Sequence, residues 1–278
     1  MVPVIEPGEQ PVVPKEAATV ILVRDGSAGP EVFLLRRVRA MAFAGGMTVF
    51  PGGGVDRRDA DASVAWAGPA PDWWARRFHC DTSLARALVC AAVRETFEES
   101  GVLLAGADPD SVVADTAAFA DARAALVDRE LSLAEFLTAN DLVLRADLLR
   151  PWANWLTPEA EVRRYDTRFF LAELPAGQRA DGVTSEADHA AWQRPADTLA
   201  DWRDGRCGLL PPTWVTLSDL AEFDSVAAAM AVSRDIGKVM PKVIREDGLL
   251  RVVLPGDPRY DGASAHLDAR PGDRLERP

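Results

Sequence analysis

Short apolar runs rich in β-branched residues, separated by turn residues, are the first regular pattern along the chain. Residues 17–23 (AATVILV) and 32–36 (VFLLR) form two such runs. Between them stand Asp25-Gly26-Ser27 and Gly29-Pro30, whose residue types favour tight turns. This succession of strand and turn signals predicts two strands that are joined as a hairpin.

Further strands are predicted later in the chain. Residues 165–174 (YDTRFFLAEL) carry an apolar run typical of a central strand, and residues 249–254 follow the turn signal Glu246-Asp247-Gly248. Residues 192–202 (WQRPADTLADW) are predicted to be the end of a strand that leads into a helix. These segments are spread over most of the chain, as expected if it forms one domain with additions.

The clearest helical periodicity lies in residues 82–100. Apolar side chains recur there at every fourth position and form a stripe, namely Val89, Val93 and Phe97. Gly101 follows directly, at the position where a glycine commonly ends a helix. We predict one long helix here and two shorter helices around residues 112–126 and 131–138.

The segment from about residue 60 to 82 follows neither period. It contains Gly68-Pro69-Ala70-Pro71 and several tryptophans, namely Trp66, Trp73 and Trp74. We predict that this segment is an inserted, peripheral lobe that contributes little to the core. The predicted organisation is a flexible N-terminal tail at 1–16, one domain at 17–260 that carries the lobe, and a polar C-terminal tail at 261–278.

Composition and charge narrow the class of protein. With 48% hydrophobic and 27% charged residues, the 278-residue chain is typical of a globular protein. It has no apolar run near the ~18 residues that cross a bilayer. A net charge of −12 disfavours binding to nucleic acid or to anionic lipid. We therefore expect no nucleic-acid partner and no membrane partner, whereas an anionic small molecule can bind if metal ions bridge the repulsion.

The start of the chain and its cysteines favour a cytoplasmic location. Residues 1–16 are proline-rich and acidic, whereas a secretory signal begins with basic residues followed by an apolar stretch. The three cysteines, Cys80, Cys90 and Cys207, cannot all pair, and none has the CxxC spacing of a zinc site. We expect reduced thiols. The oligomeric state is left open, with a homodimer as one possibility.

Three glutamates crowd one face of the long helix near its end. Glu95, Glu98 and Glu99 stand at positions i, i+3 and i+4, which brings their carboxylates together on a face roughly opposite to Phe97. Like charges at this spacing repel, and the helix dipole disfavours acids near the C-terminal end. Stability alone would not select this arrangement.

Two interpretations of these acids are open from the helix alone. A solvated acidic face is the commoner explanation of such a run. The other is a site for a hard divalent cation such as Mg²⁺ or Mn²⁺, which takes oxygen ligands and bridges carboxylates to phosphate. The glycine turn Gly52-Gly53-Gly54, which follows an apolar strand, favours the metal site, because glycines allow close approach of the backbone to a metal or phosphate.

Taken together, the glycine turn and the acidic helix resemble the Nudix box, G-x5-E-x7-R-E-U-x-E-E-x-G-U, in which U is aliphatic. The residues that match it are Gly53, Arg94-Glu95, Glu98-Glu99 and Gly101-Val102. Asp59 stands where the pattern has its first glutamate, Thr96 replaces an aliphatic residue, and the long segment at 60–82 splits the box. The catalytic half is intact, and the loop half is altered and lengthened.

The resemblance extends beyond the box to the long, split-box Nudix proteins typified by the mammalian peroxisomal coenzyme A diphosphatase. It rests on Phe50-Pro51-Gly52-Gly53, Trp155-Leu156-Thr157-Pro158, the stretch 163–170 (RRYDTRFF) and Leu254-Pro255-Gly256-Asp257. The separate coenzyme A marker of Nudix enzymes is matched at Gly46, but Ala42 occupies the position of its arginine. Coenzyme A specificity is therefore left open.

This resemblance implies an α+β Nudix fold, with a mixed β-sheet core, flanking helices and helical insertions. It also implies hydrolysis of a diphosphate linkage in a nucleotide-like small molecule, with Mg²⁺ or Mn²⁺ as cofactor. The expected metal ligands are Glu95, Glu98 and Glu99, and the expected catalytic residues are Glu98, Glu99 and Glu186, the last from a loop outside the box. The expected substrate-binding residues are Arg36, Arg37, Gly52 and Gly53.

Neighbouring residues receive secondary roles. We expect Arg94 to brace the acids or the glycine loop, Asp56 to orient that loop, and Asp59 to be either an outer ligand or a solvated side chain. Arg39, Arg163 and Arg164 are further candidates for phosphate contacts, although a surface position is the commoner role of an arginine. The histidines, His79, His189 and His266, lack a ligand spacing and are expected to be structural or exposed.

Other functions remain in competition with a coenzyme A diphosphatase. One is a hydrolase of ADP-ribose, NADH or another nucleotide. Another is a Nudix-fold binding module without turnover, which Asp59 and the split box would favour and the intact Glu95, Glu98 and Glu99 disfavour. An acidic cation-binding protein outside this family would leave the glycine turn and the Arg94-Glu95 pair unexplained.

Overall fold

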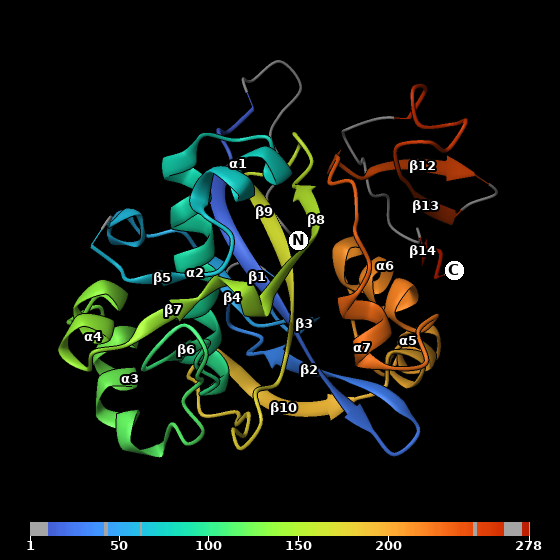
Figure 1. Ribbon diagram of the computed structural model, residues 1–278. Helices are drawn as coiled ribbons and strands as arrows, with labels where there is room; N and C mark the ends of the chain where they lie inside the picture. The colour runs from blue at the N-terminus through green and yellow to red at the C-terminus, as the bar shows by residue number, and fades with distance from the viewer. Residues whose placement is uncertain (1–10, 42–43, 62, 247–248, 264–273, 278) are drawn as a thin grey trace.

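A mixed β-sheet forms the centre of the computed structural model, which describes residues 11–41, 44–61, 63–246, 249–263 and 274–277 (Figure 1). The strand order is β10-β2-β1-β9-β8-β11, with the short strands β3 and β4 beside β2 and β1. The strands of this sheet are β1 (Lys15–Gly26), β2 (Gly29–Arg37), β3 (Thr48–Val49), β4 (Gly52–Gly54), β8 (Leu149–Leu156), β9 (Tyr165–Glu173), β10 (Ala187–Gln193) and β11 (Lys238–Val239).

Helices flank the sheet on two sides (Figure 1). One group is α1 (Pro71–Phe78), α2 (Thr82–Ser100), α3 (Ala120–Val127) and α4 (Leu133–Ala139). The other is α5 (Pro195–Arg203), α6 (Pro211–Leu220) and α7 (Val226–Met230). Two small sheets complete the described residues, β5 (Trp66–Ala67) with β7 (Val143–Arg145) and β6 (Ala105–Gly106), and β12 (Lys242–Glu246) with β13 (Leu249–Val253) and β14 (Arg274–Leu275). The predicted α+β architecture is confirmed.

The strand pairing brings the glycine turn next to the first strand. β1 and β2 form the predicted hairpin, with Gly26 opposite Gly29. Beyond it, β1 pairs with β4 so that Ala18 lies opposite Gly53. On its other side β1 runs parallel to β9, which is the predicted central strand. Because β4 is held against β1, the glycine turn has a fixed place at the sheet surface that α2 covers.

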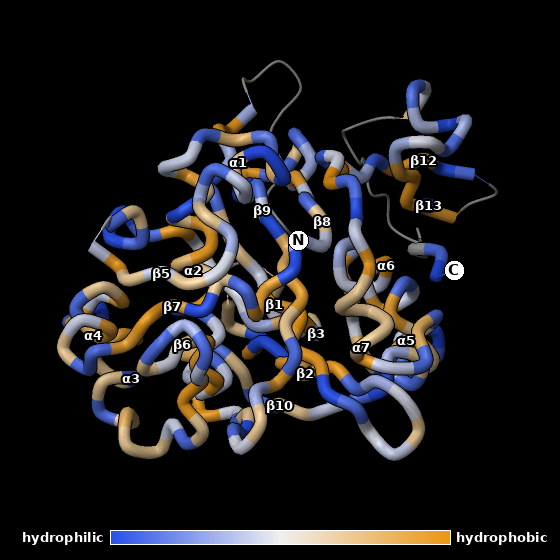
Figure 2. Tube along the Cα trace, in the orientation of Figure 1, coloured by the Kyte–Doolittle hydropathy of each residue, from blue (hydrophilic) through white to orange (hydrophobic). Residues whose placement is uncertain are grey.

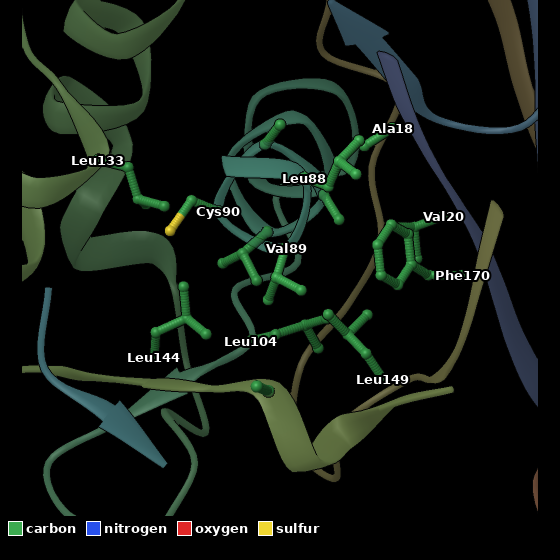
Figure 3. Close-up of a cluster of buried hydrophobic side chains, with 14 of the residues drawn as sticks. Ala18, Val20, Leu88, Val89, Cys90, Leu104, Leu133, Leu144, Leu149 and Phe170 are labelled. Carbon is green, nitrogen blue, oxygen red and sulfur yellow. The ribbon is translucent and has the colours of Figure 1, made fainter. Parts of the chain in front are cut away.

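The larger apolar core fills the space between the sheet and the layer of α1 to α4. Leu88 and Val89 of α2 point toward Ala18 and Val20 of β1 and Phe170 of β9, while Cys90 points toward Leu133 and Leu144 (Figure 3). A helix that is apolar around most of its surface belongs between two layers. The burial of α2 therefore fixes the position of the acids at its end.

A second core lies on the opposite face of the sheet. Ile21, Leu34 and Trp152 pack there against α5, α6 and α7. The small sheet further along the chain contains the strand predicted at 249–254, which is β13. Figure 2 shows that β13 is hydrophobic and that its partner β12 is largely hydrophilic. The two cores cover both faces of the central strands, which explains their nearly continuous apolar sequences.

Three predictions about the organisation need correction. The segment at 60–82 is not merely peripheral, because Trp74 of α1 is fully buried and its ring lies 5.5 Å from that of Phe170. The helix predicted at 112–126 begins only at Ala120, after a 3₁₀ turn at Ala117–Phe119. The bounds of the domain also shift, because β1 begins at Lys15 and β14, which pairs with β13, lies beyond residue 260. Within the described residues, no helix is long and apolar enough to cross a membrane.

Candidate active site

The acidic helix α2 has a defined beginning and end. The Asp81 carboxylate accepts a hydrogen bond from the Leu84 amide at 2.8 Å and caps the first turn. At the other end Gly101 adopts φ 73°, a left-handed conformation that suits glycine, and its amide donates to the Phe97 carbonyl. The predicted bounds of the helix, 82–100, are confirmed.

Arg94 joins the acids of α2 to the preceding loop. Its guanidinium donates to both carboxylate oxygens of Asp59, each at 2.9 Å. It also donates to Glu95 at 2.7 Å and to Glu98 at 3.2 Å. A further bond at 2.9 Å reaches the Gly54 carbonyl. Arg94 therefore braces both the acids and the glycine loop, as predicted.

Asp59 has neither of its predicted roles. It is 3% exposed, so it is not a solvated side chain, and both of its oxygens are held by Arg94, so they do not face outward to a ligand. The residue also accepts a bond from the Asp56 amide within a reciprocal cap at the 3₁₀ helix Arg57–Ala60. A shorter acid in place of glutamate thus serves as the partner of Arg94.

The glycine turn is fitted closely against the acids. The Gly52 amide donates to Glu99 Oε2 at 2.8 Å. A Cβ atom at Gly53 would lie 2.6 Å from the Glu95 carboxylate, so a side chain there would collide with it. The loop and the helix therefore form one unit, although the segment at 60–82 separates them in sequence.

Burial raises the pKa of each of the three glutamates. The pKa of Glu95 rises to about 7 because the carboxylate is desolvated, and Arg94 opposes this effect. Desolvation also raises the pKa of Glu98. For Glu99 the pKa lies well above its usual range, first because of burial and then because Glu95 is close, while the Gly52 amide acts in the opposite direction. Burial thus favours the uncharged acids in the protein alone.

The chemistry of this donor set fits a divalent cation. Arg94 is bonded to three carboxylates, those of Asp59, Glu95 and Glu98, and Glu99 adds a fourth beside Glu95, so the negative charge of the ionised acids exceeds the positive charge of Arg94. Mg²⁺ and Mn²⁺ prefer carboxylate oxygens. The carboxylates do not form a complete metal site in this conformation. Among the residues that the structure describes, no three His, Cys, Asp or Glu side chains lie close enough together to hold an ion. Arg94 and Gly52 hold the carboxylates instead.

The structure brings Glu186 and Arg37 toward the acids. The Arg37 guanidinium donates to Glu186 at 2.8 Å, and the Val38 amide donates to the Glu186 carbonyl. Both side chains also influence the pKa of Glu99, which Glu186 raises and Arg37 lowers. Glu186 is half exposed, so its carboxylate stays accessible beside the buried acids.

Arg36 lies apart from this group. Along β2, Phe33 and Leu35 belong to the core under α2, and Val32 and Leu34 belong to the opposite core. Arg37 continues the first set and Arg36 the second. Arg36 pairs with Asp188 at 2.6 Å, so its predicted phosphate contact stays a prediction that no contact with the acids supports.

The remaining sequence candidates have other surroundings. Arg164 donates to the carbonyls of Thr157 and Val12 and so fixes the chain beside β9. Arg163 is exposed, and His79 ends α1 in a left-handed conformation. His189 lies in β10 opposite Arg36. Ala42 and His266 lie outside the described residues.

Sequence reasoning did not identify two polar residues beside the acidic helix. Arg123 of α3 donates to the Glu98 carbonyl at 3.1 Å and to both carboxylate oxygens of Asp181, at 2.8 and 2.9 Å. Both lie far from the box in sequence. A sequence signal for them was absent because their partnership depends on how α3 and the loop before β10 fold together.

A cavity of about 310 Å³ lies elsewhere, beside α6 and β13. Leu209, Trp214 and Leu254 contribute to its wall, whereas none of the acids of α2 does. Its size is within the range of small-molecule sites. The charged cluster of α2 lies on the other face of the sheet. The cavity and the cluster of acids are therefore different places, and we take the cluster as the candidate site because its side chains can carry out chemistry.

Comparisons with known proteins identify the family. A family model described as the NUDT19 Nudix domain matches residues 79–220. The acyl-coenzyme A diphosphatase NUDT19 of Xenopus laevis is 26% identical over 83% of this chain and 71% of its own length. The Gallus gallus protein of the same name is also 26% identical, over 88% of this chain and 79% of its own. A crystal structure of a NUDIX hydrolase from Alicyclobacillus acidocaldarius is similar with a TM-score of 0.65 and 27% identity, covering 81% of this chain and 98% of that one.

Proposed function

Because this chain belongs to the family of the NUDT19 Nudix domain and is a Nudix diphosphatase, we propose that its substrate is coenzyme A or an acyl-coenzyme A. The observation that carries the proposal is the buried group of Glu95, Glu98 and Glu99, of which Arg94 ties the first two to the glycine turn and the Gly52 amide ties the third. Relatives that are named acyl-coenzyme A diphosphatase match most of this chain and support the substrate class.

In the proposed reaction, water attacks one phosphorus of the diphosphate, and the bond from that phosphorus to the bridging oxygen breaks. Nudix hydrolases generally use a divalent metal. We propose that Glu95, Glu98 and Glu99 hold Mg²⁺ or Mn²⁺, which when bound offsets the charge of the phosphates and lowers the pKa of water. Arg94 keeps the acids in place against the glycine loop.

Residues around the acids are proposed to handle the substrate and the proton. Glu186 is half exposed beside Glu99, so we propose that it accepts a proton from the attacking water. Arg37, next to it, is proposed to contact a phosphate oxygen. The amides and carbonyls of Gly52 and Gly53 provide a turn without side chains, along which the diphosphate is proposed to lie.

The main alternative substrate class is ADP-ribose, NADH or a related nucleotide, since the Nudix chemistry would be the same. A module that binds without turnover is the less favoured alternative, because the complete acid group and its brace are present. We also propose a cytoplasmic location, which the free thiols of Cys80, Cys90 and Cys207 support.

The experiment is a substrate comparison with the purified full chain in Mg²⁺ and, separately, in Mn²⁺. Coenzyme A should yield 4′-phosphopantetheine and 3′,5′-ADP, identified by mass. Its kcat/KM should exceed that of ADP-ribose by at least ~10-fold, which corresponds to ~1.4 kcal/mol. Equal or better cleavage of ADP-ribose or NADH would overturn the substrate class. Absence of turnover on every diphosphate, with binding retained, would favour the silent module.

A further inference from the structure

The loop before β10 is anchored to the end of the acidic helix. The Asp181 amide donates to the Ser100 carbonyl at 2.9 Å, immediately before the helix-ending Gly101. Upstream, the Gln178 side chain bonds both the amide and the carbonyl of Leu103, each at 2.8 Å. The next residues, 182–186, lead from this anchor to Glu186. The position of Glu186 therefore depends on what holds these few residues.

Arg123 is the side chain that spans this junction. Besides the paired bonds to Asp181 and the bond to the Glu98 carbonyl, it donates to the Val183 carbonyl at 3.2 Å. The same guanidinium thus contacts the end of α2 and the residues on both sides of Gly182. Its bond to Glu98 also satisfies one of the carbonyls that a helix end leaves without a partner.

The charge and shape of Arg123 suit this place. Glu98 and Glu99 lie at the negative end of the helix dipole, where a cation is stabilising. The planar guanidinium can grip a carboxylate and two carbonyls together, whereas a lysine ammonium cannot reproduce the paired geometry. A Cβ atom at Gly101 would lie 2.9 Å from Arg123 Nη1 and from Asp181 Oδ2, so a side chain there would push against the pair.

We infer that Arg123, paired with Asp181, is a positioning residue that sets Glu186 at the correct distance from the acids of α2. This inference rests on the proposed function, because it assigns a use to the predicted role of Glu186. Arg123 itself touches neither the acids' carboxylates nor Glu186 in any described contact. Its effect acts through the backbone of Val183 and the residues that follow.

The kinetic test is a double-mutant cycle with Glu186, measured on the substrate that the wild type cleaves best. Arg123→Gln should lower kcat about 10-fold, which is ~1.4 kcal/mol, and change KM less than ~2-fold. In a Glu186→Gln background the same change should lower kcat less than ~2-fold, because the group being positioned is already disabled. Arg123→Lys should not restore the wild-type kcat. An equal loss in both backgrounds, or wild-type kcat in Arg123→Gln, would overturn the inference.

A matched control is available at the end of β7. Arg145 forms a similar fork to Asp147, at 2.8 and 2.7 Å, and is likewise nearly buried, but it contacts Ser111 and not the loop before β10. Arg145→Gln should lower the melting temperature about as much as Arg123→Gln and leave kcat of the folded enzyme unchanged. A comparable loss of kcat in Arg145→Gln would show that disturbing this region is enough, which contradicts a positioning role.

Amide hydrogen exchange separates this inference from the proposed function. In Arg123→Gln, exchange of the amides of residues 183–186 should become at least ~10-fold faster, and Arg145→Gln should leave them unchanged. If the enzyme cleaves no diphosphate but the exchange result holds, the function fails and the anchoring stands. If diphosphate is cleaved and Glu99→Gln abolishes it, but exchange and kcat are unaffected in Arg123→Gln, only the inference fails.

Discussion

Both halves of α2 are largely buried, but burial has opposite energetic effects in the two halves. Residues 83–93 bury aliphatic side chains such as Leu88 and Val89, which are 0% exposed. Residues 94–100 bury charges, with Arg94 9% and Glu99 7% exposed. In the first half burial itself is favourable. In the second half burial raises the pKa of each glutamate, because a charged carboxylate loses its hydration there.

This difference explains how a group of mutually repelling charges is kept in place. The apolar half is fastened between the sheet and α1, and because the helix is continuous, it carries the acids to one position against the glycine turn. Arg94 then offsets part of the repulsion by bonds to Asp59, Glu95 and Glu98. The apolar half therefore stabilises the fold, whereas burial of the acids destabilises it. Such a cost is expected where residues serve function.

A single substitution in the apolar half should weaken the fold of the protein. Leu88→Ala should lower the free energy of unfolding by about 2–5 kcal/mol, because a fully buried side chain leaves a cavity among Ala18, Val20 and Phe170. The folded fraction should keep its kcat, since no acid is altered. Chemical denaturation measures the first effect and turnover per folded molecule the second. Val127→Ala, at an exposed position, is the control and should change stability by less than ~0.5 kcal/mol.

Removing one charge from the second half should lower the activity and leave the fold intact. Glu99→Gln is expected to lower kcat at least ~100-fold, or ~2.7 kcal/mol, because an amide replaces a carboxylate in the proposed metal site. The Gly52 amide keeps an acceptor, so folding should survive. Without metal the melting temperature should rise, because a buried carboxylate beside Glu95 is gone.

The control for that variant is Glu222→Gln, since Glu222 is an exposed acid outside the cluster. It should leave both kcat and the melting temperature unchanged. Glu98→Gln should behave as Glu99→Gln does. An active double variant of Glu98 and Glu99 would show that the acids of α2 are not the site of chemistry.

A smaller effect should follow from adding a methyl group to the glycine turn. At Gly53 the new Cβ would lie 2.6 Å from the Glu95 carboxylate, so Gly53→Ala should displace the acid and lower kcat about 10-fold. Gly54→Ala is a matched control, because its Cβ would meet nothing within 4 Å. Steady-state kinetics on both variants decides the matter. Equal activities would mean that close contact between the turn and Glu95 is not needed.

Local sequence signals predicted the parts of the fold that are determined locally. The long helix is correct at both ends because an aspartate cap and a glycine stop bracket a continuous helical period. The hairpin was also predicted, since its turn residues separate two apolar runs. The acids of α2 were recognisable as a group for the same reason, because their spacing on one helix fixes their proximity.

Long-range packing explains what the sequence did not reveal. The tryptophans of 60–82 gave no strand or helix period, yet Trp74 stacks with Phe78 and packs on Phe170, nearly a hundred residues away. Asp59 and Thr96 looked like defects of the box. In the structure Asp59 is the partner of Arg94, and the buried Thr96 hydroxyl donates to the Ala92 carbonyl at 2.7 Å. Such compensations depend on neighbours that no spacing rule identifies.

The last and smallest effect concerns how the stability of the metal-free protein depends on pH. Burial raises the pKa of Glu95 from 4.5 to about 7, so between these values the folded state binds more protons than the unfolded state. The stability must then fall as the pH rises through this window. The contribution of Glu95 to the free energy of unfolding is fully present only below about pH 4.5. Melting temperatures measured in chelator from pH 4.5 to 7 should decline more steeply for the wild type than for Glu95→Gln, which lacks the titrating group. Saturating Mg²⁺ should reverse the decline, because a cation bound to the ionised acids stabilises the folded state by mass action. Parallel profiles for the two proteins in chelator would mean that Glu95 is already charged throughout, and that Arg94 alone offsets its burial.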